Sequence, residues 1–178
     1  NQHLYEQGKA AFVCNRSMKS SIAAFKYGAR KEYGRYYAAE LAKKHESWIK
    51  KTGAQALIPV PIHKERHKKR GYNQAKVIAD YLEGETGIPV IDDYLIRIKN
   101  TEALKELSAA ERKASLEDAF LVSETSKLLY RNLRCVILVD DIYTTGSTIN
   151  ECAATLKKSG VLKVYFLCAC IGKDQGGE

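Results

Sequence analysis

The chain has 178 residues, which is enough for one domain with a sizeable hydrophobic core. Hydrophobic residues make up 45% and charged residues 28%, and no apolar run reaches the length of a membrane span, so we expect a soluble globular protein. The formal net charge of +8 favours polyanionic partners such as a pyrophosphate or a nucleic acid, although a merely basic surface explains it equally well. No leader-like pattern opens the chain, and a cytoplasmic location is therefore predicted.

The cysteines are odd in number and fall mostly in apolar stretches. We expect all five to be unpaired, buried, small hydrophobic residues in a reducing compartment. Two of them are two residues apart in a strand-like run, yet no second pair or histidine cluster completes a zinc site. The five are Cys14, Cys135, Cys152, Cys168 and Cys170.

The first 52 residues predict helices. Residues 1–19 carry little pattern, residues 20–28 suggest a short helix that ends at Gly28, and residues 33–51 hold helical spacing. His45 lies on the apolar face of the longer helix, where a hydrogen-bonded boundary residue is expected rather than a metal ligand.

Residues 54–61 predict the first strand, and the most basic stretch of the chain follows it. Residues 63–70 carry five permanent positive charges against one negative charge. They are expected to form a cationic loop at the carboxyl end of the strand, before a helix that begins near Gln74. The arginine fork suits pyrophosphate oxygens, so the candidate ligands are Arg66 and Arg70, together with His63 and Lys64. A solvated charged loop is the alternative.

Short strands are predicted at residues 88–91 and 94–98, around a turn that contains Asp92 and Asp93. A long polar connection, residues 99–115, comes next, and Ser108 with Glu111 forms a candidate capping box in it. Such a long connection is usually functional or disordered. Further strands are predicted at residues 119–122 and 163–171. Strands interleaved with helices imply an α/β fold with a central parallel sheet.

Residues 135–148 form the stretch around which the chain is organised. Five apolar residues predict a buried strand, and Asp140 and Asp141 follow at its carboxyl end. A polar loop comes next, and residues 149–160 have the apolar spacing of a helix. The loop consists of Thr144, Thr145, Gly146, Ser147 and Thr148.

The loop is expected to bind a phosphate, because free N–H groups and the positive end of the helix dipole point into it. The two carboxylates suit the vicinal hydroxyls of a ribose instead, since they accept hydrogen bonds. Together they suggest a ribose 5-phosphate. The alternative is an ordinary buried strand with a solvated acid pair and a capping threonine.

Residues 136–148 resemble the signature of type I phosphoribosyltransferases. The segment PVPIHKERHKKRGYNQ is similar to the ComF branch of that superfamily, the competence-associated proteins, and residues 101–120 match most of the ComF pattern T…LS..ER…AF. Leu104 and Ser115 depart from it, where Gln and Asn are usual. Tyr72, Asn73 and Gln74 match without a gap, but chemistry alone assigns them no role.

The resemblance implies a type I phosphoribosyltransferase-like fold with a small hood. The chain would be a single domain over residues 1–178, with the hood in residues 1–52, the core in residues 53–172 and a flexible lid in residues 99–115. Phosphoribosyl pyrophosphate would bind with Mg²⁺, which Asp140 or Asp141 would reach directly or through water. The implied activity is transfer of the phosphoribosyl group to an amine or a base.

The alternative function is non-catalytic. ComF proteins are implicated in DNA uptake, so the resemblance also implies single-stranded DNA and a helicase-like competence protein as partners. The paired cysteines of an N-terminal zinc ribbon are absent, since Cys14 stands alone, and such a module would have to precede Asn1. The sequence leaves open whether the chain forms a homodimer.

Overall fold

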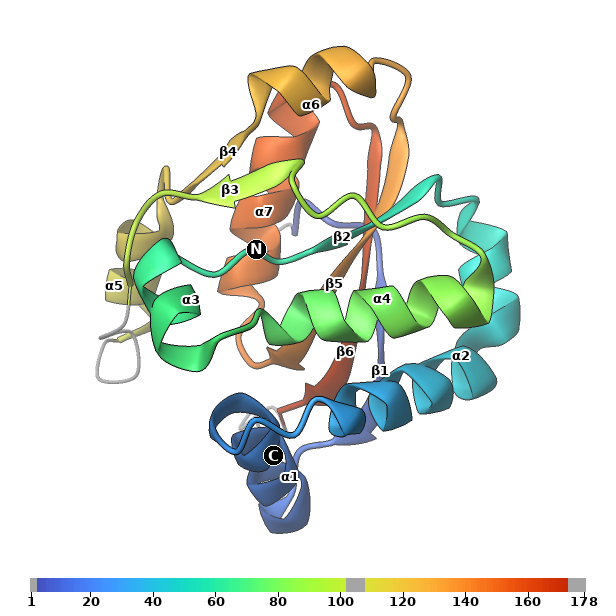
Figure 1. Ribbon diagram of the computed structural model, residues 1–178. Helices are drawn as coiled ribbons and strands as arrows, with labels where there is room; N and C mark the ends of the chain where they lie inside the picture. The colour runs from blue at the N-terminus through green and yellow to red at the C-terminus, as the bar shows by residue number, and fades with distance from the viewer. Residues whose placement is uncertain (1–2, 102–107, 173–178) are drawn as a thin grey trace, which may run out of the picture.

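The computed structural model describes residues 3–101 and 108–172. Its centre is a parallel sheet whose strands run in the order β1-β6-β5-β2 (Figure 1). The strands are β1 (Gly8–Val13), β2 (Ala56–Pro59), β5 (Cys135–Tyr143) and β6 (Lys163–Ile171). Helices flank the sheet, and the predicted α/β fold class is confirmed.

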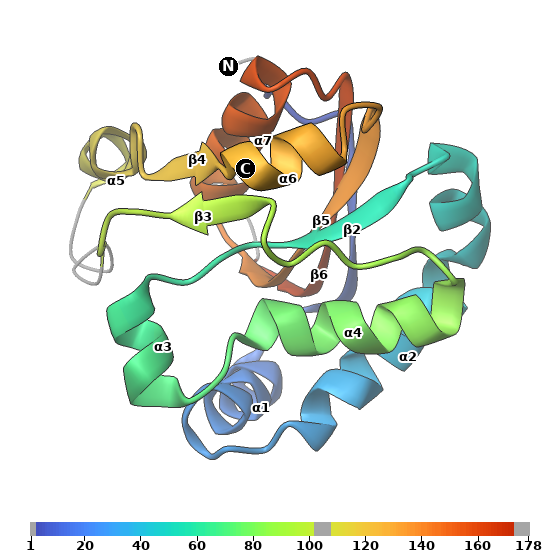
Figure 2. The same ribbon diagram turned by 45° about the horizontal axis from the view of Figure 1, so that its top comes forward.

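Alternate residues of the central strands face two separate cores. Val136 and Leu138 of β5 face a core that contains helix α7 (Ser147–Lys158), whereas Ile137 and Val139 face the other core. Three helices cover that second face, as Figure 2 shows: α1 (Arg16–Tyr27), α2 (Glu32–Thr52) and α4 (Gln74–Thr86). Burial on both faces explains why the strands read as unbroken apolar runs.

A small second sheet lies outside the central one. Strand β3 (Leu95–Arg97) pairs antiparallel with β4 (Phe120–Val122), and helix α6 (Glu124–Leu129) follows. Between these two strands in sequence, helix α5 (Ala109–Leu116) has Ser108 as its N-cap, and the predicted capping box is confirmed there. The predicted lid is thus described only in part, and Leu104 lies outside the described residues.

The other predicted elements differ mainly in their ends. The predicted helix over residues 20–28 is α1, which starts four residues earlier, and the strand predicted at 88–91 is reduced to one bridge between Val90 and Leu57. His45 is half-buried, and its Nε2 is hydrogen-bonded to the carbonyl of Ala10 at 2.8 Å, as expected of a boundary residue.

Two local expectations were wrong, and one strand was not predicted. Residues 64–70 form a short helix, α3 (Lys64–Arg70), rather than a loop, because lysine, glutamate and arginine are good helix formers and Gly71 stops the helix at a φ of 81°. Strand β5 continues through the acid pair to Tyr143, because β6 pairs with it as far as Ile171. Strand β1 was not predicted, because residues 1–19 carry little pattern and the strand that pairs with β1, β6, lies far away in sequence.

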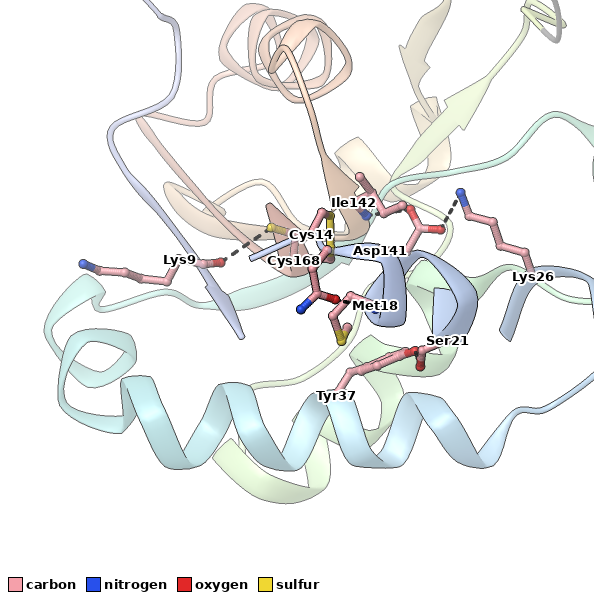
Figure 3. Close-up of a disulfide and its surroundings, with 11 residues drawn as sticks. Lys9, Cys14, Met18, Ser21, Lys26, Tyr37, Asp141, Ile142 and Cys168 are labelled. Atoms are coloured by element: carbon pink, nitrogen blue, oxygen red, sulfur yellow. Dashed lines mark hydrogen bonds and ion pairs between the residues drawn. A yellow bond between two sulfur atoms is a disulfide. The ribbon is translucent and has the colours of Figure 1, made fainter. Parts of the chain in front are cut away.

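The expectation of five unpaired cysteines was also wrong. Cys14 and Cys170 form a disulfide, with their Cα atoms 5.4 Å apart (Figure 3). The two residues are 156 apart in sequence, but the parallel register of β1 and β6 pairs Phe12 with Cys170 and so brings Cys14 beside it. Cys135, Cys152 and Cys168 are free.

Across residues 3–101 and 108–172, every helix is too short or too polar to cross a membrane.

Candidate functional site

A pocket of about 300 Å³ collects most of the predicted site residues. It lies where β2 and β5 end and where α3 and α4 begin, which is the edge at which open α/β sheets bind ligands. A hollow of about 380 Å³ between α2 and α4 is larger but contains none of the predicted site residues. Of those residues, the smaller pocket is lined by Arg66, Arg70, Asp140, Asp141, Thr144 and Thr148.

The acid pair is held by its own backbone and by a lysine from α1. Asp140 accepts a hydrogen bond from the N–H of Asp141, and Asp141 accepts one from the N–H of Ile142, both at 2.8 Å. The other Asp141 oxygen lies 3.0 Å from Lys26 Nζ. Figure 3 shows this ion pair. The side chains of Lys26 and Asp141 are 23% and 12% exposed, so this ion pair is largely shielded from water.

These surroundings separate the two carboxyl groups in acidity. Burial, and then the neighbouring charge of Asp141, raise the pKa of Asp140 well above its usual range. Burial would also raise the pKa of Asp141, but the charge of Lys26 and the hydrogen bonds from Lys26 and from the Ile142 N–H outweigh it and lower that pKa. Asp141 is therefore the firmly ionised member of the pair, and Asp140 holds a proton more readily.

The polar loop begins helix α7, but its residues line two hollows. Thr144 and Thr148 line the pocket, whereas Thr145, Gly146 and Ser147 line a neighbouring hollow of about 220 Å³. The hydroxyls of Thr145 and Ser147 are hydrogen-bonded to each other at 2.9 Å. The predicted phosphate ligands are thus divided, and only two of the five line the same pocket as the acid pair.

Gly146 is required by the shape of this loop. Its φ is +78°, and a Cβ at this position would collide with the hydroxyl of Tyr143. The Tyr143 ring stacks on Phe166 at 4.7 Å between centroids, and its hydroxyl is hydrogen-bonded to that of Tyr5. This aromatic support was not predicted, because Tyr5, which precedes β1, and Phe166 of β6 are both far from the loop in sequence.

Helix α3 turns its two arginines and its lysines in different directions. Arg66 and Arg70 are half-buried against the pocket, whereas Lys64 and Lys68 are exposed. His63 is buried and caps α3, since its Nδ1 accepts a hydrogen bond from the N–H of Glu65 at 3.4 Å. His63 and Lys64 are thus absent from the described lining of the pocket.

Sequence reasoning missed several residues of the site. Lys26 and Arg97 both line the pocket, and neither belongs to a motif that could have revealed it. Burial, and then the charge of Arg66, lower the pKa of Arg97. Arg66 and Arg97 line the same pocket, so their like charges favour an anion bound there.

A metal ion would need ligands from outside the protein. Within residues 3–101 and 108–172, no group of three or more His, Cys, Asp or Glu side chains converges. Asp140 and Asp141 could supply only a minority of the oxygen ligands of a Mg²⁺ ion. Substrate oxygens and water would supply the rest.

The chain is similar to proteins named for competence and for DNA utilization. It is 40% identical over 111 residues to "Competence protein F" of Haemophilus influenzae, covering 62% of this chain and 47% of that protein. It is 32% identical over 114 residues to "DNA utilization protein YhgH" of Escherichia coli K12, covering 64% of this chain and 48% of that protein. Identity to "Competence protein ComFC" of Bacillus subtilis is 27% over 157 residues, covering 88% of this chain and 60% of that protein.

The chain thus spans about half the length of the first two of these relatives. No family model matches it. The resemblance to the ComF family that the sequence indicated is confirmed by these relatives.

Proposed function

We propose that this chain, a relative of the ComF proteins, acts in DNA uptake or utilization and contributes a pocket that binds phosphoribosyl pyrophosphate. The names of the relatives support the first part. The second part depends on one observation: an acid pair and three arginines, which come from separate segments, line a single pocket beside a helix N-terminus.

Each part of the ligand has a matching group in this pocket. The ribose diol would donate hydrogen bonds to Asp140 and Asp141, and the 5-phosphate would lie against Thr144 and Thr148 at the start of α7. The pyrophosphate would lie toward the guanidinium groups of α3 and β3, which carry positive charge and directed donors.

The ligand has to compete with Lys26 for Asp141. Lys26 already neutralises the Asp141 carboxylate, so the hydrogen bonds of the ribose diol should stabilise binding most at Asp140. Mg²⁺ would be held by the Asp140 carboxylate, directly or through water. When bound, Mg²⁺ would neutralise pyrophosphate charge. If the protein is a transferase, the arginines stabilise the departing pyrophosphate, and the acid pair stabilises positive charge on the ribose.

The acid pair is tested by calorimetric titration of phosphoribosyl pyrophosphate with Mg²⁺ into the Asp140→Asn and Asp141→Asn variants. Asp140→Asn should weaken binding about tenfold, or about 1.4 kcal/mol, because an amide accepts fewer hydrogen bonds and carries no charge for Mg²⁺. Asp93→Asn is the matched control, since Asp93 is an exposed residue of the other acid pair. Unchanged affinity in both site variants would remove the acids from the site.

Enzyme and binding protein are separated by a second assay. Release of pyrophosphate on addition of candidate amines or nucleobases would identify a transferase. Binding without release, across a broad panel of acceptors, would favour a regulatory pocket instead.

The second candidate function is binding of single-stranded DNA without catalysis. Lys64 and Lys68 project into solvent from α3 beside the pocket, and Tyr27, 68% exposed, lies against Arg70. Such lysines can follow a phosphate backbone, and an exposed ring can stack on a base. The relatives' names favour this function over an enzyme whose work is unrelated to DNA.

Its test is the salt dependence of oligonucleotide affinity. Changing both Lys64 and Lys68 to Glu should weaken binding and flatten the plot of log affinity against log salt, because fewer counterions are released. Lys43→Glu, an exposed lysine on α2, is the control. Wild-type affinity that does not fall as salt is added would exclude this function.

A further inference from the structure

Gln74 carries a buried hydrogen-bond donor for which the described part of the chain offers no partner. It is the first residue of α4, it is 2% exposed, and it lines the pocket. Its Oε1 accepts a hydrogen bond from Arg70 Nη1 at 3.0 Å. Its Nε2 finds no acceptor among the described residues. Buried donors of this kind are uncommon in native proteins and call for an explanation.

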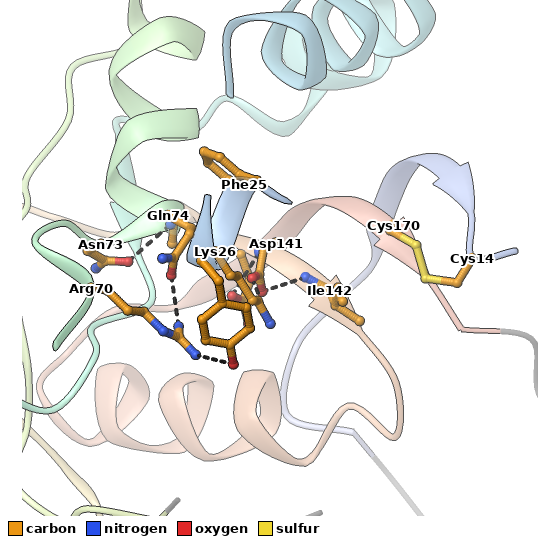
Figure 4. Close-up of polar contacts among 12 residues, drawn as sticks. Cys14, Phe25, Lys26, Arg70, Asn73, Gln74, Asp141, Ile142 and Cys170 are labelled. Atoms are coloured by element: carbon orange, nitrogen blue, oxygen red, sulfur yellow. Dashed lines mark hydrogen bonds and ion pairs between the residues drawn. A yellow bond between two sulfur atoms is a disulfide. The ribbon is translucent and has the colours of Figure 1, made fainter. Parts of the chain in front are cut away.

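The orientation of this amide is fixed by chemistry. The two ends of a glutamine amide have similar shapes, and a rotation would exchange them. Arginine, however, has only donors, so the amide must present its oxygen to Arg70. Figure 4 shows the oxygen of Gln74 on the contact with Arg70. The NH₂ of Gln74, a residue that lines the pocket, is therefore left without a partner among the described residues.

The two residues before Gln74 have structural roles that account for them. Tyr72 donates its hydroxyl hydrogen to the carbonyl of Phe25 and thereby joins α1 to the turn between α3 and α4. Asn73 caps α4 by accepting from the N–H of Ala75 at 3.0 Å, and it donates to the carbonyl of Val60 at 3.1 Å. Of these three consecutive residues, only Gln74 has a polar group left unused.

We propose that the Gln74 amide donates a hydrogen bond to a pyrophosphate oxygen of the bound ligand, and that Gln74 and Arg70 bind this group as one unit. Arg70 is held in place by Gln74 and by the hydroxyl of Tyr27, to which its Nη2 donates at 3.3 Å. A cation and a neutral donor held side by side suit a diphosphate, which offers several oxygens close together. This inference rests on the proposed function, because it concerns the same ligand.

The test uses two substitutions at one position. Gln74→Met keeps the approximate volume and removes the donor, while Gln74→Glu keeps an oxygen for Arg70 and replaces the donor with an acceptor. Titration calorimetry of the full chain with phosphoribosyl pyrophosphate, inorganic pyrophosphate and ribose 5-phosphate, each with Mg²⁺, separates the parts of the ligand. Gln55→Met is the matched control, because Gln55 is an exposed glutamine just before β2, at the end of the strand opposite to the pocket.

We expect Gln74→Met to bind phosphoribosyl pyrophosphate and pyrophosphate about five- to twentyfold more weakly and to leave ribose 5-phosphate affinity unchanged. Gln74→Glu should bind the two pyrophosphate ligands more weakly still, because a carboxylate repels them. Wild-type affinity of Gln74→Met for both pyrophosphate ligands would overturn the inference, and so would a loss confined to ribose 5-phosphate. A wild-type protein that binds none of the three ligands would instead refute the proposed function.

A measurement on the wild-type protein covers the case in which a variant fails to fold. The side-chain NH₂ signals of Gln74 in a nitrogen–proton correlation spectrum should shift when pyrophosphate is added, while those of Gln55 stay in place. Unmoved Gln74 signals at saturating pyrophosphate would contradict the proposed hydrogen bond.

Discussion

Replacing Lys26 with Met tests the ion pair that α1 makes with the acid pair. The substitution keeps most of the side-chain volume and removes the charge that lies 3.0 Å from Asp141. Asp141 then remains 8% exposed beside a second carboxyl, without its counter-charge. We expect a less stable protein, together with a rise in the pKa of Asp141.

The size of the loss follows from the burial of the pair. At 3.0 Å and an effective dielectric constant of about 20, the attraction is about 5 kcal/mol before desolvation is subtracted. Exposed pairs contribute about 0–1 kcal/mol, and removing one partner of a buried pair costs about 3–5 kcal/mol. Side chains that are 23% and 12% exposed fall between these cases, so we expect a loss of about 2–3 kcal/mol near neutral pH.

The loss of stability in Lys26→Met should depend on pH, because the ion pair shifts the pKa of Asp141. Lys26 lowers the folded-state pKa of Asp141, so the pair's stabilisation is present above the unfolded pKa of about 4 and is lost as pH falls through the folded pKa. In Lys26→Met the pKa of Asp141 is raised. As pH falls, Asp141 therefore takes up a proton, which removes the cost of burying an unpaired carboxylate. The difference between variant and wild type should therefore be largest near pH 7.5 and clearly smaller near pH 4.5.

Urea denaturation followed by circular dichroism measures the free energy of unfolding at both pH values. A double-mutant cycle with Asp141→Asn isolates the interaction itself. Lys50→Met is the control, because Lys50 pairs with Glu46 in full exposure and should matter little. A coupling energy near zero, or a loss that is the same at both pH values, would refute the reasoning.

Two further predictions concern the loop and the disulfide. Gly146→Ala should destabilise the protein by more than about 1 kcal/mol, because alanine is strained at a φ of +78° and its methyl group meets Tyr143; a melting temperature equal to that of Gly84→Ala, which has open space around it, would contradict this. Cys14→Ser should lower stability by about 2–5 kcal/mol under oxidising conditions, because the bond closes a loop across 156 residues. With a reductant present the variant and wild type should denature together, and equal stability without reductant would argue against the disulfide.

The sequence alone determined the elements whose stability is local or whose pattern is periodic. The helix stripe of Ile149, Cys152, Ala153 and Leu156 is buried as its spacing predicted, and β6 has the predicted bounds. The capping box at Ser108 forms as expected, because its two partners are three residues apart. Such features depend on neighbours along the chain, and the sequence states them directly.

Tertiary structure decided everything that depends on distant segments meeting. Lys26 pairs with Asp141 because the fold packs α1 near the end of β5. Cys14 is bonded to Cys170 because β1 lies beside β6 in the sheet. The unused donor of Gln74 was equally invisible, since a missing partner is known only when every neighbour is in place. No spacing along the chain encodes these contacts, because packing of the whole core sets them.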